Sequence, residues 1–377
     1  MDENEFLTQI YSCVDCKDCM EVCDTYKVTS DEIKSPNGRL KIAEKVFSNN
    51  VITENEVIGL YTCTLCGLCD LICQQDIQIS EIIHSSKVNL VEKDQAPLEI
   101  HNKIIKEIIE KDNSVGGNPD QRLNWLPENH KKKEEFEKKD SETLLFLGCM
   151  SSFRVKESAL APYEILKLAG YDFKILKKEP CCGEYVYSAG NLKLAKQIFK
   201  DNIKIFNKIG IKNLIVTCGG CLYAFDKVYR KYFRDFTINV RHIIEVIYEL
   251  VENNKISLKS LNKSITYHDP CRVGRKYRSG PLYSEPRELL KKCGLEIREL
   301  THNREESPCC GAGSGIRGVD SSICIKIGKE LFTSVATQDI ATSCPLCVFN
   351  FRYVNYKNQT EKESKYITDY ILESMKK

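Results

Sequence analysis

The sequence lacks the long apolar run that a membrane-spanning helix requires. Its 377 residues contain no stretch that approaches about 18–20 uninterrupted apolar residues. The first ten residues, MDENEFLTQI, also lack the basic and apolar regions of a secretion signal. We therefore expect a cytoplasmic protein without a membrane span, which could associate peripherally with a membrane only through a partner.

The sequence also has little net charge. With 55 basic against 53 acidic residues, its composition indicates no nucleic-acid partner and no strongly anionic tail. A flavin or nicotinamide fingerprint is missing as well, because the glycine-rich CCGAGSG at residues 309–315 has no clear strand-to-helix context. We therefore expect no flavin or nicotinamide to be bound by this chain itself.

The sequence is rich in cysteine, with 20 residues. They are too dilute, and the chain too long, for a disulfide-stapled secreted domain, whereas their arrangement in CxxC units is typical of metal sites. Two pairs are adjacent, Cys181–Cys182 and Cys309–Cys310. Consecutive Cα atoms lie about 3.8 Å apart, but bridged cysteines need roughly 4.4–6.8 Å. Each pair therefore delivers two thiolates to one metal centre or forms a reactive redox pair.

An internal repeat near the N-terminus contains eight of the cysteines. Residues 10–28 match residues 60–79, and each copy has the spacing C-x2-C-x2-C-x3-C. The cysteines are Cys13, Cys16, Cys19 and Cys23 in the first run, and Cys63, Cys66, Cys69 and Cys73 in the second. Two-cluster ferredoxins use this run, in which three cysteines hold one 4Fe–4S cluster and the fourth holds the other. On this interpretation Cys73 completes the cluster of the first run, and Cys23 completes that of the second.

The surroundings of the two runs predict a helical domain over residues 1–115. Neither fourth cysteine is followed by proline, and the interval between the runs contains helix-like sequence. Both features favour a helical ferredoxin over the compact β-rich kind. The alternative, a pair of zinc ribbons, would use two separated CxxC pairs per site and would leave the runs of four unexplained.

Residues 116–142 have the composition of a linker, rich in Gly, Pro, Asn and mixed charge. Within it the charged stretch 130–140 could be a partner-docking helix, but we favour a solvated surface segment. We expect Trp125 to anchor the linker on a domain surface.

A second duplication fills residues 143–377. TLLFLGCMSSFRV at 143–155 matches SITYHDPCRVGRK at 264–276, EPCCG matches SPCCG, and NLIVTCGGCLYAFD at 213–226 matches DIATSCPLCVFNFR at 339–352. Short apolar runs alternate with amphipathic helical stretches in both copies. This pattern predicts two tandem α/β domains, 143–260 and 261–377, each with a mostly parallel sheet. The cysteines directly follow strand-like runs, at the sheet end where α/β folds bind ligands.

Each half supplies five cysteines to one expected site. They are Cys149, Cys181, Cys182, Cys218 and Cys221 in the first half, and Cys271, Cys309, Cys310, Cys344 and Cys347 in the second. A cubane 4Fe–4S cluster needs four thiolates, so a fifth indicates a bridging thiolate, an opened cluster or a cysteine free to react. We expect Gly183 and Gly311 to adopt backbone angles closed to other residues, so that the two preceding side chains converge.

The pattern C-x(n)-CCG-x(n)-CxxC, present twice, resembles the cysteine-rich CCG domains of heterodisulfide reductases. It also resembles those of the iron–sulfur subunits of flavin-linked glycolate, lactate and glycerol-3-phosphate dehydrogenases. With the ferredoxin part in front, the chain is similar to the catalytic iron–sulfur subunit of a heterodisulfide reductase. The resemblance covers essentially the whole chain.

The resemblance implies two cubane and two non-cubane 4Fe–4S clusters, the latter held by the ten cysteines of the two halves. In the methanogen enzyme such centres cleave the mixed disulfide of coenzymes M and B. Cys181, Cys182, Cys309 and Cys310 would then be catalytic, in an oxidoreductase served by a flavoprotein or a cytochrome b-type subunit. The alternative is an electron-relay subunit of a flavin-linked dehydrogenase. We favour disulfide reduction because all ten positions are filled.

Several other residues have two interpretations. His268 precedes Cys271 by three residues and could protonate a leaving thiolate, or it could simply form a local hydrogen bond. The basic side chains that follow could attract an anionic substrate or form a solvated face; they are Arg272, Arg275, Lys276 and Arg278. Cys293 and Cys324 have no counterparts in the first half, and we expect them to be buried packing residues.

Overall fold

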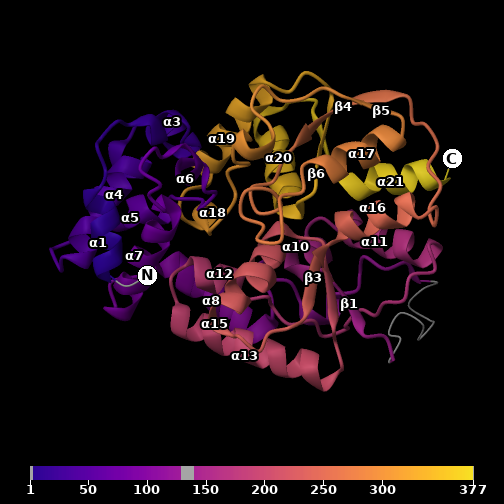
Figure 1. Ribbon diagram of the computed structural model, residues 1–377, viewed down its shortest axis with the longest axis horizontal. Helices are drawn as coiled ribbons and strands as arrows, with labels where there is room; N and C mark the ends of the chain where they lie inside the picture. The colour runs from indigo at the N-terminus through magenta and orange to yellow at the C-terminus, as the bar shows by residue number, and fades with distance from the viewer. Residues whose placement is uncertain (1–2, 129–139, 377) are drawn as a thin grey trace. The chain divides into compact units, whose positions relative to one another are not determined.

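The computed structural model describes residues 3–128 and 140–376 (Figure 1). Nearly all of the charged stretch 130–140 lies outside these residues. Contacts between residues divide the chain into two compact units. One, the helical unit, consists of Met1–Ile105, Tyr185–Ala195 and Pro308–Thr333. The other, the sheet unit, consists of Lys106–Glu184, Lys196–Ser307 and Ser334–Lys377.

The helical unit contains the duplicated cysteine runs, and the expected helical character of this region is confirmed. Its helices are α1 (Glu3–Tyr11), α2 (Asp18–Glu21), α3 (Asp24–Thr29), η1 (Glu32–Lys34), α4 (Pro36–Phe47), α5 (Glu54–Tyr61), α6 (Leu68–Ile72), α7 (Ile79–Glu92), α18 (Ile316–Val319) and α19 (Ser321–Thr333). Three helices cross from one unit to the other: α8 (Glu99–Lys111), α12 (Glu184–Ser188) and α13 (Leu192–Lys208).

Local sequence explains where the helices of this unit begin. The Ser35 hydroxyl accepts the backbone N–H of Gly38 at the start of α4, with Pro36 at the first helical position. Thr53 and Glu56 form a reciprocal capping box at the start of α5. The apolar faces of α4 and α7 then pack into one core through residues such as Leu40 and Ile82.

The sheet unit contains two parallel sheets. The first has the order β1-β2-β3, from β1 (Thr143–Phe146), β2 (Asn213–Val216) and β3 (Asn239–His242). The second has the order β5-β4-β6-β7, from β4 (Lys263–His268), β5 (Leu295–Ile297), β6 (Asp339–Thr342) and β7 (Glu363–Tyr366). A bridge from Leu144 to Lys174 occupies the place beside β1 that β5 takes beside β4. The predicted duplication of two parallel α/β halves is therefore confirmed.

The helices of the sheet unit pack around these strands. They are η2 (Pro119–Gln121), α10 (Gly148–Phe153), α11 (Glu157–Leu168), α14 (Gly219–Leu222), the π-helix η4 (Tyr223–Tyr229), α15 (Arg230–Tyr232), α16 (Ile243–Glu252), α17 (Ser284–Lys292), η5 (Arg304–Glu306), α20 (Pro345–Asn358) and α21 (Ile367–Lys376). Helices α11, α16, α17 and α21 contact one another between the two sheets (Figure 1).

One apolar core joins the two halves of the sheet unit. It contains Leu145 and Ile215 from the first sheet and Ile265 and Ala341 from the second. The linker also enters this core through Trp125, which is buried and packs edge-on against the Tyr163 ring, with centroids 5.5 Å apart. Trp125 therefore anchors the linker, but inside the core and not on a domain surface as the sequence predicts.

Candidate metal centres

The second cysteine run lines a cavity in the helical unit. Cys63, Cys66 and Cys69 form part of its wall, and the fourth cysteine that reaches it is Cys23, from the first run. This is the crossed set that the sequence predicts. A space whose lining includes four thiols fits a cluster in which each iron takes its own thiolate.

The first run gathers in the corresponding crossed way. Burial is the main cause that raises the pKa of Cys19 to about 12, and the nearby thiols of Cys13, Cys16 and Cys73 raise it further. Cys73, from the second run, therefore lies close to the thiols of the first run.

The two runs share their backbone geometry. Lys17 and Gly67 occupy matching positions of the repeat and have φ of 68° and 77°. Asp15 and Leu65, two residues earlier, have φ of 54° and 52°. These left-handed residues curl each loop around its cysteines, which is unusual for side chains other than glycine and indicates a geometry set by the ligands.

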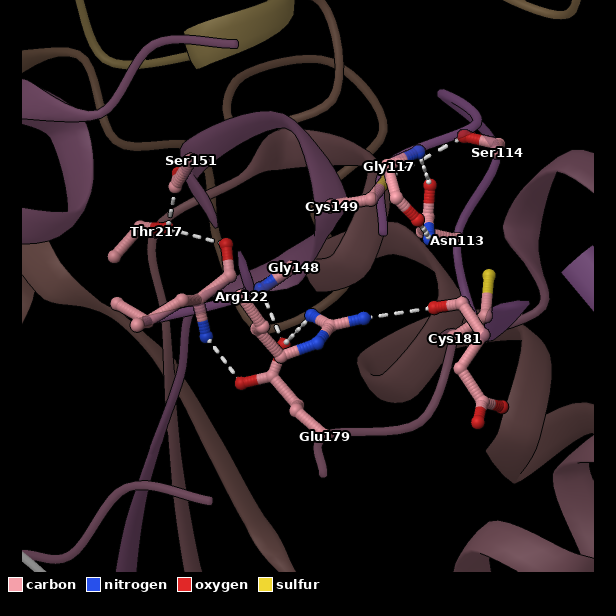
Figure 2. Close-up of polar contacts among 12 residues, drawn as sticks. Asn113, Ser114, Gly117, Arg122, Gly148, Cys149, Ser151, Glu179, Cys181 and Thr217 are labelled. Carbon is pink, nitrogen blue, oxygen red and sulfur yellow. Dashed lines mark hydrogen bonds and ion pairs between the residues drawn. The ribbon is translucent and has the colours of Figure 1, made fainter. Parts of the chain in front are cut away.

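The five cysteines of the first half converge in the sheet unit, at the carboxyl ends of β1 and β2. Hydrogen bonds with Cys181 and Cys221 lower the pKa of Cys182, while hydrogen bonding to Cys182 raises the pKa of both partners. Burial raises the pKa of Cys149, whose Sγ lies 3.3 Å from the Ser114 hydroxyl (Figure 2). So many buried thiols ionise together only when a cation offsets their charge.

Glycines shape both adjacent pairs as the sequence predicts. Gly183 has φ of +80° and Gly311 has φ of +87°, a region that L side chains rarely adopt. The Gly183 N–H donates to Cys181 Sγ at 3.5 Å, and the Gly311 N–H donates to Cys309 Sγ at 3.4 Å. The expectation of special backbone angles at these positions is confirmed.

A buried ion pair fixes the first site, and sequence reasoning missed it. Glu179 accepts the backbone N–H groups of Leu147 and Gly148, both at 2.8 Å, and pairs with Arg122 at 3.2 Å (Figure 2). Arg122 also donates to the Asp112 carbonyl. Glu179 thus joins the loop of Cys149 to the loop of Cys181. The position of Glu179 directly before the sequence PCC could have indicated a role at the site. Arg122 lies in the predicted linker, where no sequence pattern indicates such a role.

The cysteines of the second half are divided between the two units. Cys271, Cys344 and Cys347 belong to the sheet unit, where hydrogen bonds with Cys218 and Cys347 lower the pKa of Cys344. One thiol of the first half, Cys218, therefore contacts one of the second, Cys344. Cys309 and Cys310 belong to the helical unit, where the Cys309 N–H donates to the Asp24 carboxylate at 2.7 Å.

Arg272 links the two halves of the sheet unit. Its buried guanidinium pairs with Glu184 and lies 4.7 Å from the centroid of the Tyr223 ring. A Cβ on Gly219, inside the first CxxC, would lie 3.3 Å from Arg272 Cβ and 3.6 Å from Cys344 Sγ. The arginine therefore packs on the first CxxC loop, and burial distinguishes it from Arg278, which is exposed.

The other candidate residues are engaged locally. His268 is buried, lies 3.4 Å from the Thr342 hydroxyl and packs edge-on against Phe351, so the geometry favours the local role over the catalytic one. Arg275 donates to the carbonyls of Glu305 and Ser307. Cys293 and Cys324 are fully buried in apolar clusters, as expected.

Within residues 3–128 and 140–376, no three His, Cys, Asp or Glu side chains are arranged to share one metal ion. The cysteines of the second run instead line a cavity, and the donor chemistry of the cysteine groups is that of iron–sulfur proteins. The same residues include no helix both long and apolar enough to cross a bilayer.

Family comparisons agree with this arrangement. A 4Fe–4S dicluster domain matches residues 9–77, and a cysteine-rich CCG domain matches twice, at 143–226 and 265–352. The chain is thus an iron–sulfur protein with a dicluster ferredoxin domain followed by two CCG domains. Its homologues include subunits of heterodisulfide reductases and related iron–sulfur oxidoreductases.

Three relatives illustrate the range. A subunit of the dihydromethanophenazine:CoB–CoM heterodisulfide reductase of Methanosarcina mazei is 26% identical over 91% of this chain and 88% of its own length. A subunit of the fumarate reductase (CoM/CoB) of Methanothermobacter marburgensis is 26% identical over 94% of this chain and 69% of its own. EtfAB:quinone oxidoreductase of Syntrophomonas wolfei is 32% identical over 60% of this chain but 32% of its own. These relatives support an oxidoreductase-type role.

Proposed function

We propose that this chain is the disulfide-reducing iron–sulfur subunit of a heterodisulfide reductase-like complex. The observation that carries the proposal is the contact between Cys218 of the first five-cysteine set and Cys344 of the second. A disulfide accepts two electrons, and two adjacent centres can each supply one. The relatives named for coenzymes M and B favour a disulfide of that class as substrate.

The proposed cofactors are two cubane and two non-cubane 4Fe–4S clusters. The cubane clusters would be held by Cys13, Cys16, Cys19 and Cys73, and by Cys63, Cys66, Cys69 and Cys23. The non-cubane clusters would be held by the five-cysteine sets of the proposed domains 143–260 and 261–377. These domains follow the proposed ferredoxin domain 1–115 in the sequence. When bound, the clusters would supply one-electron redox chemistry. The residues around the clusters would position them and shield them from water.

Contacts within the helical unit support a route for the electrons. The Asp24 carboxylate, next to Cys23, accepts the Cys309 N–H. The Thr64 carbonyl, between Cys63 and Cys66, comes so close to Gly313 that a Cβ there would lie 2.9 Å away. The second cysteine run therefore packs on the loop of Cys309 and Cys310, and electrons would leave the ferredoxin part there.

The overall reaction is RS–SR′ + 2e⁻ + 2H⁺ → RSH + R′SH. The S–S bond breaks, each sulfur gains one electron from the chain, and each thiolate takes a proton. Cys181, Cys182, Cys309 and Cys310 are the proposed catalytic residues, and Arg272 holds the first CxxC loop in place. His268 remains a proposed proton donor, although its contacts with Thr342 and Phe351 favour a structural role.

A relay function is the second candidate, and the relative named EtfAB:quinone oxidoreductase favours it. In that case a flavin dehydrogenase would be the partner, and the chain would pass electrons onward without touching a disulfide. Under the first candidate the partner is a flavoprotein or a cytochrome b-type subunit. Both place the chain in the cytoplasm, or at the inner membrane face through that partner.

One experiment separates the candidates. The anaerobically purified protein is assayed for viologen-linked reduction of the coenzyme M–coenzyme B disulfide, with EPR before and after the disulfide is added. A new EPR signal together with turnover supports the reductase, and Cys182→Ala should abolish both while the ferredoxin signals persist. No turnover, combined with rapid reduction by a flavin dehydrogenase, would establish the relay instead.

A further inference from the structure

The two copies of the cysteine run have the same sequence pattern but opposite exposure. Tyr61, in the second copy, is 0% exposed, and its counterpart Tyr11 is 64% exposed. Thr64 is 6% exposed, and its counterpart Val14 is 65% exposed. Since the backbone of the two loops is alike, the surroundings and not the loop fold cause this difference.

Segments of this chain cover the second copy within the helical unit. The Tyr61 hydroxyl donates to the Ala189 carbonyl at 2.7 Å, and the Tyr61 ring packs against His101 with centroids 4.6 Å apart. The Thr64 carbonyl approaches Gly313. The covering segments Tyr185–Ala195 and Pro308–Thr333 belong to the two CCG halves. The second copy is thus covered by other segments of the same chain.

The first copy carries the same features without that cover. Tyr11 and Val14 are large apolar side chains beside Cys16, which is itself exposed. Exposed apolar side chains grouped around a functional loop mark interaction surfaces. Asp15 and Lys17, on the same loop, are exposed and of opposite charge, so this face favours short-range apolar docking over long-range electrostatic steering.

We propose that the loop Tyr11–Lys17 is the docking surface for a separate redox protein that carries a one-electron cofactor. The partner covers Tyr11 and Val14 as the CCG segments cover Tyr61 and Thr64. While docked, its reduced cofactor loses one electron at a time to the cluster beside Cys16, and two such transfers supply one disulfide. This inference rests on the proposed function and adds the surface through which electrons arrive.

The test uses the full tagged chain, purified anaerobically from its own cells with the subunits that remain bound. Hydrogen exchange of residues 11–18 is compared between this assembly and the chain alone. We expect at least tenfold slower exchange in the assembly. Equal exchange, protection in an assembly of this chain with itself, or a preparation without any flavin-, haem- or iron–sulfur-bearing partner would overturn the proposal.

Matched variants give a second readout. Tyr11→Glu and Val14→Glu should lower the amount of co-purified redox partner at least tenfold, whereas Val51→Glu, at an apolar position 89% exposed and outside both runs, should not change it. EPR of each variant checks that its clusters are present. If the wild-type protein fails in viologen-linked disulfide reduction, the proposed function falls, but the exchange result still decides the docking surface.

Discussion

The guanidinium of Arg39 lies against the sulfur of Cys23, with 4.0 Å between Nη1 and Sγ. The arginine is fully buried, and its other nitrogens donate to the Gly59 carbonyl at 2.8 Å and the Thr62 hydroxyl at 3.2 Å. It lines the cavity of the second run together with the carboxylate-bearing Asp24. Asp70 adds a second carboxylate, 3.7 Å from Cys69 Sγ. Arg39 therefore offsets negative charge beside the cysteines of the second run.

Replacing this cation should make the adjacent cluster harder to reduce. For Arg39→Gln we expect the equilibrium constant for reduction of the cluster beside Cys23 to fall about tenfold. This lowers its reduction potential by about 59 mV for one electron, while the potential of the other cluster is unchanged. Redox titration followed by EPR measures both. Lys45→Gln is the matched control, because Lys45 lies on the same helix but is exposed and pairs with Glu56, outside both cysteine runs. Unshifted potentials in Arg39→Gln with full cluster content would contradict the role of the arginine.

Single serine substitutions test the crossed ligand sets. Cys23→Ser should remove or alter the cluster of the second run, and Cys73→Ser that of the first, because each fourth cysteine reaches the other run. Iron content and the EPR spectrum of the remaining cluster identify which one is lost. Spectra in which each substitution damages its own run would exclude the crossed arrangement.

Sequence predicted the elements whose chemistry depends on spacing along the chain. The crossed cysteine runs, the duplicated halves and the glycines behind each pair are all local patterns that ligand geometry or strand periodicity imposes. Gly183 is an example, since its φ follows from the need to turn two consecutive side chains toward one centre.

Sequence did not predict the features that depend on packing between distant segments. Nothing in the local pattern indicates that Pro308–Thr333 belongs with the ferredoxin helices, where Val28 packs on a cluster that includes Ile323 and Ile327. The same holds for the pair of Arg122 and Glu179, 57 residues apart. Such contacts are specified by burial and shape, which no short motif records.

Alanine substitutions of two glycines should separate backbone strain from steric fit. Gly210 has φ of +70° and open space around its missing Cβ, so Gly210→Ala should cost about 1 kcal/mol of unfolding free energy. At Gly183 a Cβ would also lie 2.8 Å from the Phe199 ring, which adds about 1–3 kcal/mol of overpacking. Anaerobic urea denaturation compares the two, and iron content should fall only in Gly183→Ala. Equal losses of unfolding free energy in the two variants would show that the side chains around Gly183 rearrange to accept a Cβ.

The stability of the sheet unit should depend on pH through Asp369. Burial raises the pKa of Asp369 from 3.8 to about 7, Glu157 raises it further and Arg352 opposes the change. The neutral carboxyl therefore stabilises the folded state fully below about pH 4, and this contribution is lost as pH rises through 7. At pH 8 the unfolding free energy of Asp369→Asn should exceed that of wild type by about 2 kcal/mol, which denaturant titration measures as a higher midpoint. The difference should shrink toward pH 5. A difference independent of pH would refute this origin.

The pair of Glu179 and Arg122 predicts an unequal response to single and double substitution. Glu179→Gln leaves the Arg122 charge buried without its partner, which costs about 3–5 kcal/mol. In Glu179→Gln/Arg122→Met the orphaned charge is gone, and part of that stability should return.

The iron content of the first half should not follow overall stability in the Glu179→Gln/Arg122→Met variant. Glu179 also accepts the N–H groups of Leu147 and Gly148 with both carboxylate oxygens, and a glutamine has only one acceptor oxygen for them. The loop of Cys149 should therefore stay loosened in the double variant, and the iron content of the first half should remain low although stability recovers. If iron content and stability recover together, the carboxylate acts only as a counter-charge and does not position the cysteine loop.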